Sequence, residues 1–304
     1  PEDASRELAK LGGQDLEQLV QAAKSKDFKP VSLGVTTSFD FKNKVNRSST
    51  ANVYGVLKGS DPQLSDEYVI YTAHHDHLGI GEPDAEGDKI YNGAMDNAAG
   101  TATLIEVARA MAASPDRPKR SILFAAVTAE EKGLLGSEYL AQNPVVGNGR
   151  VVGVVNLDMP VLLYDFTDMI AFGSNHSTLG ESVARAGARL GIALSADPMP
   201  EQGIFTRSDH YRFVQAGVPS VMLMTGFGNG GEKIWSDFFA QHYHKPSDAL
   251  DLPFNWQAAA RFAHVNYLVA RELADAPQAP LWYADSFFGQ AVGGDQPRAV
   301  RPAS

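Results

Sequence analysis

The sequence contains no cysteine, which excludes disulfide bonds and thiolate metal sites. Any metal that the protein binds must therefore be held by His, Asp and Glu side chains. Basic residues are also scarce, because 26 Lys and Arg stand against 36 Asp and Glu and give a formal net charge of −10. No dense run of Lys and Arg marks a nucleic-acid-binding or membrane-binding surface. We therefore expect neither kind of partner.

Long apolar runs are missing as well. No stretch approaches the roughly 18 consecutive apolar residues that a membrane-spanning helix needs, so we expect no membrane span. The remaining composition is ordinary for a globular protein, with 44% hydrophobic and 20% charged residues. A chain of 304 residues can bury a full core. It begins at Pro1 without a signal-peptide pattern, and we expect the natural N-terminus to lie further upstream.

Short apolar, β-branched runs alternate with segments of helical periodicity. We predict strands over 51–59, 67–73, 122–128, 151–157 and 219–224, with a weaker one over 31–39. We predict helices within 3–24 and over 98–112, 133–142, 179–190, 208–216 and 254–274, and an aromatic, glycine-rich loop over 227–241. Near-continuous apolar strands indicate a sheet that is buried on both faces. The predicted fold is therefore a three-layer α/β fold, whose mostly parallel, mixed central sheet carries helices on both faces.

No internal repeat or linker divides the chain. We predict a helical and connecting segment over 1–45 that packs on one main domain over 46–277. A C-terminal extension over 278–304 is expected to end in a partly disordered Pro/Gly tail.

Acidic residues and histidines follow three of the predicted strands directly. These residues are His74, Asp76, His77, Glu130, Glu131 and Asp158. Ligands of such sheets bind outside the carboxyl ends of the strands. The sequence therefore predicts a polar site at that edge of the sheet.

The adjacent acids Glu130 and Glu131 are the most unusual pair. Two carboxylates at a buried strand end repel each other unless a positive charge lies between them. A dication would supply that charge. One Glu would then bind the metal, and the other would remain free to take a proton from water. A solvated acidic loop is the alternative.

Asp96 and His244 are the remaining candidates for a metal site. Asp96 stands at the start of a predicted helix, where it can act as a plain N-cap or can bridge two cations. His244 precedes a predicted turn. Together with His74 and the acids they exceed the three protein ligands of an open catalytic zinc site, and they fit two metals that share one Asp.

His75 and His77 are weaker candidates for a metal role, and the remaining histidines receive none: His176, His210, His242 and His264. His75 and His77 are expected to pack or to line the rim of the substrate site. A metal-binding His usually donates its second ring N–H to a carboxylate, and Asp76 or another neighbour can be that partner of His74.

Five motifs occur in one order along the chain. They are Ala-His-x-Asp-His, Gly-Ala-x-Asp-Asn-x-x-Gly, Ala-Glu-Glu-x-Gly-Leu-Leu-Gly-Ser, Asn-Leu-Asp-Met and Tyr-His-x-Pro-x-Asp. In this order they resemble the co-catalytic di-zinc exopeptidases of metallopeptidase clan MH, and especially its secreted bacterial aminopeptidases. The resemblance spans approximately residues 50 to 275. Met159-Pro160 departs from the family pattern, in which Met-x-Gly is frequent.

The resemblance implies two Zn²⁺ per chain, with Co²⁺ or Mn²⁺ as substitutes. The implied metal ligands are His74 and Asp158 for one ion, Glu131 and His244 for the other, and Asp96 as the bridge. By the same resemblance Glu130 would be the general base and Asp76 would orient His74. A cis peptide bond between Asp96 and Asn97 is also implied.

The resemblance further makes 46–277 a catalytic domain that removes the N-terminal residue of a peptide with a free N-terminus. It places Arg207 and Tyr243 near the substrate. Trp235, Phe205, Phe238 and Phe239 form either an apolar side-chain pocket or ordinary loop packing. The free amine would be held by acids such as Glu130 and Asp158.

Three alternatives stay open. One is carboxypeptidase or dipeptidase action, which the shortage of arginines near Arg207 and Arg212 disfavours. The others are glutaminyl cyclisation with a single zinc, and a non-catalytic, receptor-like role. The resemblance also implies a secreted or periplasmic location, with the chain cut from a longer precursor.

Overall fold

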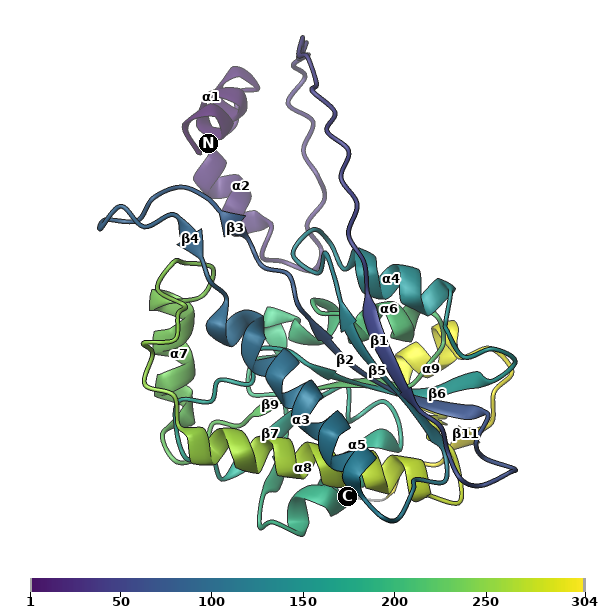
Figure 1. Cartoon of the computed structure of the whole chain (residues 1–304). Coiled ribbons are helices and arrows are strands. Elements are labelled where there is room, and N and C mark those ends of the chain that lie inside the picture. The colour runs from purple at the N-terminus through teal and green to yellow at the C-terminus, as the bar shows by residue number, and fades with distance from the viewer. Residues whose placement is uncertain (1, 303–304) are drawn as a thin grey trace. The chain divides into compact units, whose positions relative to one another are not determined.

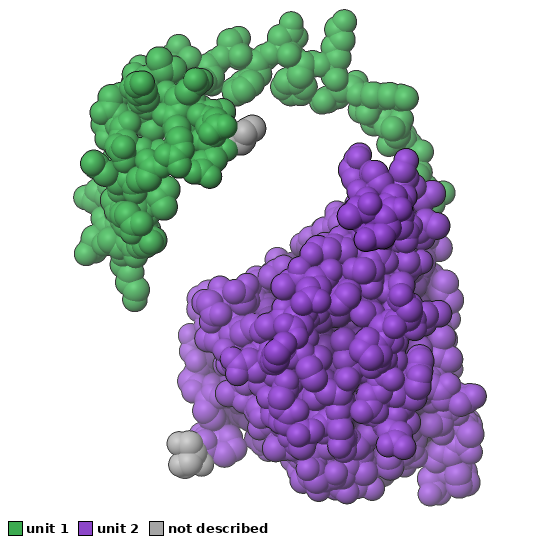
Figure 2. Space-filling model, turned by 90° about the vertical axis from the view of Figure 1, so that its left-hand side faces the viewer, with its two compact units in different colours: residues 1–49 green, residues 50–304 purple. Residues whose placement is uncertain are grey.

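The computed structural model describes residues 2–302 (Figure 1). The chain forms two compact units, Pro1–Ser49 and Thr50–Ser304, which Figure 2 shows in different colours. None of the helices within the described residues is long and apolar enough to cross a membrane.

The first unit contains the helices α1 (Glu2–Leu11) and α2 (Leu16–Ala22). Asp15 caps α2, because its carboxylate accepts a hydrogen bond of 2.9 Å from the Gln18 amide. Residues 28–49 carry no helix or strand, so the predicted strand over 31–39 is wrong. Its alternation is weak, and Phe39 is 81% exposed, so the alternating pattern has no buried face to stabilise it.

The second unit is built on a seven-stranded sheet of order β1-β5-β2-β6-β9-β7-β8. The strands are β1 (Val53–Leu57), β2 (Glu67–His74), β5 (Ser121–Val127), β6 (Arg150–Leu157), β7 (Asp168–Phe172), β8 (Ala193–Ser195) and β9 (Ser220–Thr225). The four central strands β5, β2, β6 and β9 are parallel. The outer strand β1 pairs antiparallel with β5, and β7 pairs antiparallel with β9. The predicted mixed, mostly parallel sheet is confirmed.

Both faces of the central strands are covered. Val69 and Tyr71 of β2 pack in a core with the helices α3 (Ala99–Ala113), α5 (Leu179–Ala188) and α8 (Trp256–Asp275). Ile70 points to the opposite face, toward α4 (Leu135–Gln142) and α6 (His210–Gln215). Successive side chains of a strand alternate between faces, so a continuous apolar run is what a sheet between two helical layers requires. Figure 1 shows α3 and α8 side by side along the sheet.

Two parts of the second unit differ from the sequence prediction. The predicted loop over 227–241 contains the helix α7 (Gly231–Gln241), whose Trp235 and Phe238 are buried one turn apart. Short strands β7 and β8 were not predicted, and two hairpin-like strands, β3 (Gly79–Ile80) and β4 (Ile90–Tyr91), lie in the loop after β2. Short 3₁₀ turns η2 (Pro200–Gln202) and η3 (Ile204–Thr206) precede α6.

The C-terminal segment contains β10 (Trp282–Tyr283), α9 (Phe287–Val292) and β11 (Arg298–Ala299). Trp282 is buried, and its indole donates a hydrogen bond of 2.9 Å to the Gly217 carbonyl. Arg301 lies over the Tyr283 ring and pairs with Asp285. The Trp282 contact ties the segment to the turn between α6 and β9, and the Arg301 contacts join parts of the segment to each other.

Candidate metal centre

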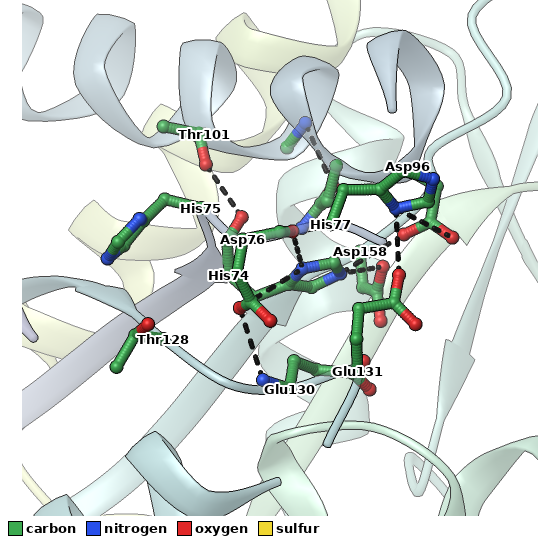
Figure 3. A network of polar contacts seen from close by, with 12 residues as sticks. His74, His75, Asp76, His77, Asp96, Thr101, Thr128, Glu130, Glu131 and Asp158 are labelled. Atoms are coloured by element: carbon green, nitrogen blue, oxygen red, sulfur yellow. Dashed lines mark hydrogen bonds and ion pairs between the residues drawn. The ribbon is translucent and has the colours of Figure 1, made fainter. Parts of the chain in front are cut away.

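The site lies at the carboxyl edge of the central strands (Figure 3). His74 is the last residue of β2 and pairs in register with Val127, the last residue of β5. Glu130 and Glu131 follow β5 by a few residues, and Asp158 directly follows β6. Because these strands are parallel neighbours, their ends bring the side chains to one place.

Asp96 reaches the same place on a separate turn, η1 (Ala94–Ala98), which precedes α3. The turn contains the cis peptide bond between Asp96 and Asn97 that the family resemblance implied. Asp96 does not cap the helix. Instead the Asn97 side chain accepts a hydrogen bond of 3.1 Å from the Gly100 amide.

One group of ligand atoms surrounds His74. Its Nε2 lies 3.2 Å from Asp96 Oδ1 and 3.1 Å from Asp158 Oδ1. All three residues are buried. An imidazole nitrogen and two carboxylate oxygens at this spacing can hold one cation.

A second group lies on the other side of Asp96. His244 Nε2 is 3.2 Å from Asp96 Oδ2 and 3.4 Å from Glu131 Oε2. Asp96 therefore offers one carboxylate oxygen to each group. The five residues expected as metal ligands all lie in these two groups.

His77 also belongs to the second group. Its Nδ1 lies 2.8 Å from Glu131 Oε1 and 3.9 Å from Asp96 Oδ2. The sequence interpretation placed His77 in packing or at the rim. The repeated His of His-x-Asp-His was the available signal, because a chain that turns at a strand end can bring both imidazoles to the same side.

The protonation behaviour of the metal-free site fits a cation-binding role. Burial lowers the pKa of His74, but Asp158 and Asp96 raise it well above its usual value. Burial raises the pKa of Asp96, yet hydrogen bonds from His244 and His74 hold it below its usual range. Without a metal, the carboxylates are therefore balanced by protons on the histidines.

Buried atoms without partners point to the same role. Within residues 2–302, the buried His77 Nε2 makes no hydrogen bond, and His77 Nδ1 and Glu131 Oε1 face each other at 2.8 Å without hydrogen-bond geometry. Buried polar atoms of this kind usually mark a missing ion or water. The set of imidazole and carboxylate donors without thiolate suits zinc, and the residues present fit a metal pair.

Asp76 contacts both His74 and the segment that carries Glu130. His74 Nδ1 is 3.0 Å from the Asp76 main-chain carbonyl and 3.9 Å from its carboxylate. The carboxylate accepts a hydrogen bond of 3.1 Å from the Glu130 amide. Asp76 thus orients the imidazole through its main chain, and its side chain fixes the backbone of Glu130.

Asp248 holds the turn that carries Asp96, although the sequence analysis assigned it no role. Its carboxylate accepts hydrogen bonds of 2.7 Å from the Met95 amide and 3.0 Å from the Asp96 amide. Its main-chain carbonyl accepts from Ala94. Asp248 follows His244 by four positions. One short segment therefore supplies the candidate ligand His244 and also holds the turn that carries the candidate ligand Asp96.

A buried polar chain supports Asp158 from behind. Thr72 donates to the Asn156 side-chain oxygen at 2.7 Å, and Asn156 donates from its amide nitrogen to Ser208 Oγ at 2.7 Å. Ser208 in turn donates to Asp158 Oδ2 at 2.5 Å. This oxygen is the one that does not face His74.

A cavity of about 290 Å³ opens beside Asp96, Glu130 and Asp158. Its apolar wall consists of Met159, Met199, Ile204, Met222, Met224, Trp235 and Phe239, and Arg207, Ser208 and Tyr243 add polar groups. Of the residues expected near the substrate, Arg207, Tyr243 and Trp235 line the cavity. Phe205 does not, because its ring packs against His176, His210 and Phe288. Phe238 belongs to α7 and is buried in the core.

The fold is a mixed β-sheet between helices, and a cluster of imidazoles and carboxylates lies at the carboxyl edge of that sheet. This combination defines a candidate metal-dependent enzyme. The model of Peptidase family M28 matches residues 52–270, and the chain belongs to that family. The resemblance inferred from the five motifs is therefore confirmed.

Individual relatives agree with this family. A probable zinc metalloprotease of Pyricularia oryzae is 29% identical over 283 residues, covering 80% of this chain and 53% of the relative. The zinc aminopeptidase of Bacillus subtilis superposes with a TM-score of 0.57 at 22% identity, covering 75% of this chain and 51% of that one. The glutaminyl cyclase of Porphyromonas gingivalis superposes with a TM-score of 0.55 at 18% identity, covering 73% and 77%. Both structures share the fold, and the chain spans about half the length of the curated relative.

Proposed function

We propose that this protein is a zinc-dependent aminopeptidase that hydrolyses the N-terminal peptide bond of its substrate. The observation that carries the proposal is the position of Asp96, whose two carboxylate oxygens lie 3.2 Å from His74 Nε2 and 3.2 Å from His244 Nε2. A single carboxylate between two imidazole-containing groups is suited to bridge a pair of cations.

In this proposal His74 and Asp158 hold one zinc ion, Glu131 and His244 hold the other, and Asp96 contacts both. When bound, the zinc ions would activate a water molecule for attack and would stabilise the negative charge of the transition state. The polar chain through Ser208 and the two amide contacts of Asp248 keep the carboxylates in place.

Glu130 is the proposed general base. It lines the cavity next to Asp158, and its backbone amide is fixed by Asp76. Burial, followed by the negative charge of Asp158, raises the pKa of Glu130 to about 9 in the metal-free protein. A carboxyl group with this tendency to hold a proton is suited to take one from the attacking water and to return it to the leaving amine. Cations at the site oppose this rise and keep the group ready to accept.

The cavity indicates the substrate class. The acids Glu130 and Asp158 at its inner end suit a free, positively charged amine. The wall beyond them is apolar, and four methionines give it an adaptable shape. We therefore propose N-terminal residues with apolar side chains as the preferred substrates.

The test combines elemental analysis with a panel of aminoacyl-nitroanilides, each with a free or an acetylated amine. We expect two zinc ions per chain, activity on the free amines alone, and loss of activity on chelation with recovery when zinc is restored. Equal hydrolysis of acetylated substrates would reject aminopeptidase action.

Glutaminyl cyclisation is the second candidate, because the fold is shared with the Porphyromonas gingivalis enzyme. It would require one zinc per chain and release of ammonia from peptides that begin with glutamine. The metal count and an ammonia assay on such a peptide separate the two activities.

A further inference from the structure

One imidazole in the metal centre has no part in the proposed function. His77 is only 7% exposed, its Nδ1 faces Glu131 Oε1 at 2.8 Å without hydrogen-bond geometry, and its Nε2 makes no hydrogen bond to any residue in 2–302. A buried imidazole usually has a partner for at least one nitrogen. Its neighbour Glu131 Oε1 has no hydrogen bond within the same residues.

His77, Asp96 and Glu131 offer ligand atoms that lie within 4.8 Å of one another, and His244 contacts the same Asp96 oxygen and the second oxygen of Glu131. His77 Nδ1 is 2.8 Å from Glu131 Oε1 and 3.9 Å from Asp96 Oδ2, and His244 Nε2 is 3.2 Å from Asp96 Oδ2 and 3.4 Å from Glu131 Oε2. Two ligand atoms of a tetrahedral zinc, each about 2.0–2.1 Å from the ion, lie about 3.3 Å apart. The four observed separations fall on either side of this value.

The backbone also makes room for this imidazole. Gly93 has a positive φ of 66°, and a Cβ at this position would lie 2.6 Å from His77 Cγ. The ring of His77 also packs edge-on against that of His244, with centroids 5.7 Å apart. Glycine at position 93, in the turn that leads to Asp96, thus leaves space for His77 to face Glu131.

We propose that His77 is a third imidazole ligand of the metal centre. This inference rests on the proposed function and refines it. The site at Glu131 then has four protein ligands, namely His77, His244, Glu131 and Asp96, one more than the three of an open catalytic zinc site. The site at Asp158 has three, namely His74, Asp96 and Asp158, and keeps a position for a non-protein ligand. The two metals are therefore unequal, and the ion at the three-ligand site is lost first.

X-ray absorption of the zinc-loaded enzyme tests the ligand count directly. Three imidazoles shared by two ions give about 1.5 per zinc, whereas two imidazoles give about 1.0. We expect the higher value in the unaltered protein, and the lower value in His77→Gln. A value of about 1.0 in the unaltered enzyme that holds two zinc ions overturns the role of His77 and leaves the proposed function intact.

A chelator competition provides the second measurement. His77→Gln is expected to weaken the tighter of the two zinc sites by at least about tenfold, since ligand and neighbouring substitutions change metal affinity by this order or more. His75→Gln is the matched control, because His75 is the exposed neighbour whose ring contacts the Ala51 carbonyl and no candidate ligand. Equal affinities in the two variants overturn the inference. Failure of the unaltered protein to bind zinc overturns both this inference and the proposed function.

Discussion

The two halves of the metal centre are built from different parts of the fold. The half around Asp158 is formed at strand ends, and His74, Asp158 and the supporting Ser208 are all buried. The half around Glu131 depends on His244, which stands in a loop and whose side chain is 35% exposed. The first half is therefore held by the sheet and a buried polar chain, and the second by loop contacts.

The two halves therefore differ in how firmly their side chains are held and in how many protein ligands the proposal gives them. The half on the sheet has the better-supported side chains, whereas the loop half has one more protein ligand in the proposal above, because His77 joins His244, Glu131 and Asp96. A rigid, incompletely filled site suits chemistry, because an open position can take up a reacting group while the protein stays fixed. The substitutions below test whether the halves are independent, in order of decreasing expected effect.

The largest effect is expected from Glu130→Gln. This change removes the proposed base but no proposed ligand, so kcat should fall by about a thousandfold while two zinc ions remain bound. Steady-state kinetics together with elemental analysis check both parts. Its neighbour offers the contrast, since Glu131→Gln should lose zinc from the loop half. An unchanged kcat in Glu130→Gln removes Glu130 from its role.

The second effect is expected from Asp248→Asn, which should affect both halves at once. The amide keeps one oxygen, so one of the bonds to the Met95 and Asp96 amides is lost and the bridging ligand is less firmly held. We expect zinc affinity at both sites to fall by about 10–100-fold, and thermal unfolding to show a loss of about 1–3 kcal/mol. Loss of zinc from one site alone would mean that Asp96 is positioned by other contacts.

How well the sequence predicted each site residue also depends on whether that residue follows a strand or is held by distant loop contacts. His74, Glu130, Glu131 and Asp158 were predicted because each follows an apolar strand, and parallel strands bring their carboxyl ends together. Asp248 ends the motif Tyr-His-x-Pro-x-Asp, but its role was missed because its contact with Asp96 spans 152 positions of the sequence. Ser208 was missed for the same reason.

The fold shows the same limit. The apolar runs of β2, β5, β6 and β9 specified strands because both faces of each are buried. The helix α7 was taken for a loop because the glycines before it obscured the spacing of Trp235 and Phe238, whose burial depends on residues far away in the chain. Family resemblance supplied what local physics did not, including the pairing of His244 with Glu131.

The third effect is expected from Ser208→Ala, which should weaken only the half on the sheet. The hydroxyl bonds Asp158 at the oxygen that does not face His74, so its loss frees the carboxylate to rotate. One of the two zinc ions should bind about tenfold more weakly, within the range known for such supporting contacts. Ser236→Ala is the control, because Ser236 lines the same cavity but donates only to the Glu232 carbonyl. Equal weakening of both zinc ions would show that the two halves share one support.

The smallest effect is expected from Met222→Ala, which changes the cavity and leaves both halves intact. Met222 lines the apolar wall. Among the described residues, its side chain makes no hydrogen bond to a candidate ligand. Removing its side chain enlarges the space, so kcat/KM should shift by about tenfold from a leucyl toward a phenylalanyl substrate, since a few methylene groups in an apolar pocket discriminate by this order. Zinc content should stay at the level of the unaltered enzyme. Because the comparison is between two substrates on one variant, partial unfolding cancels from the ratio. An unchanged ratio would mean that the N-terminal side chain of the substrate lies elsewhere, and the apolar wall would then have to be assigned to a later residue of the peptide.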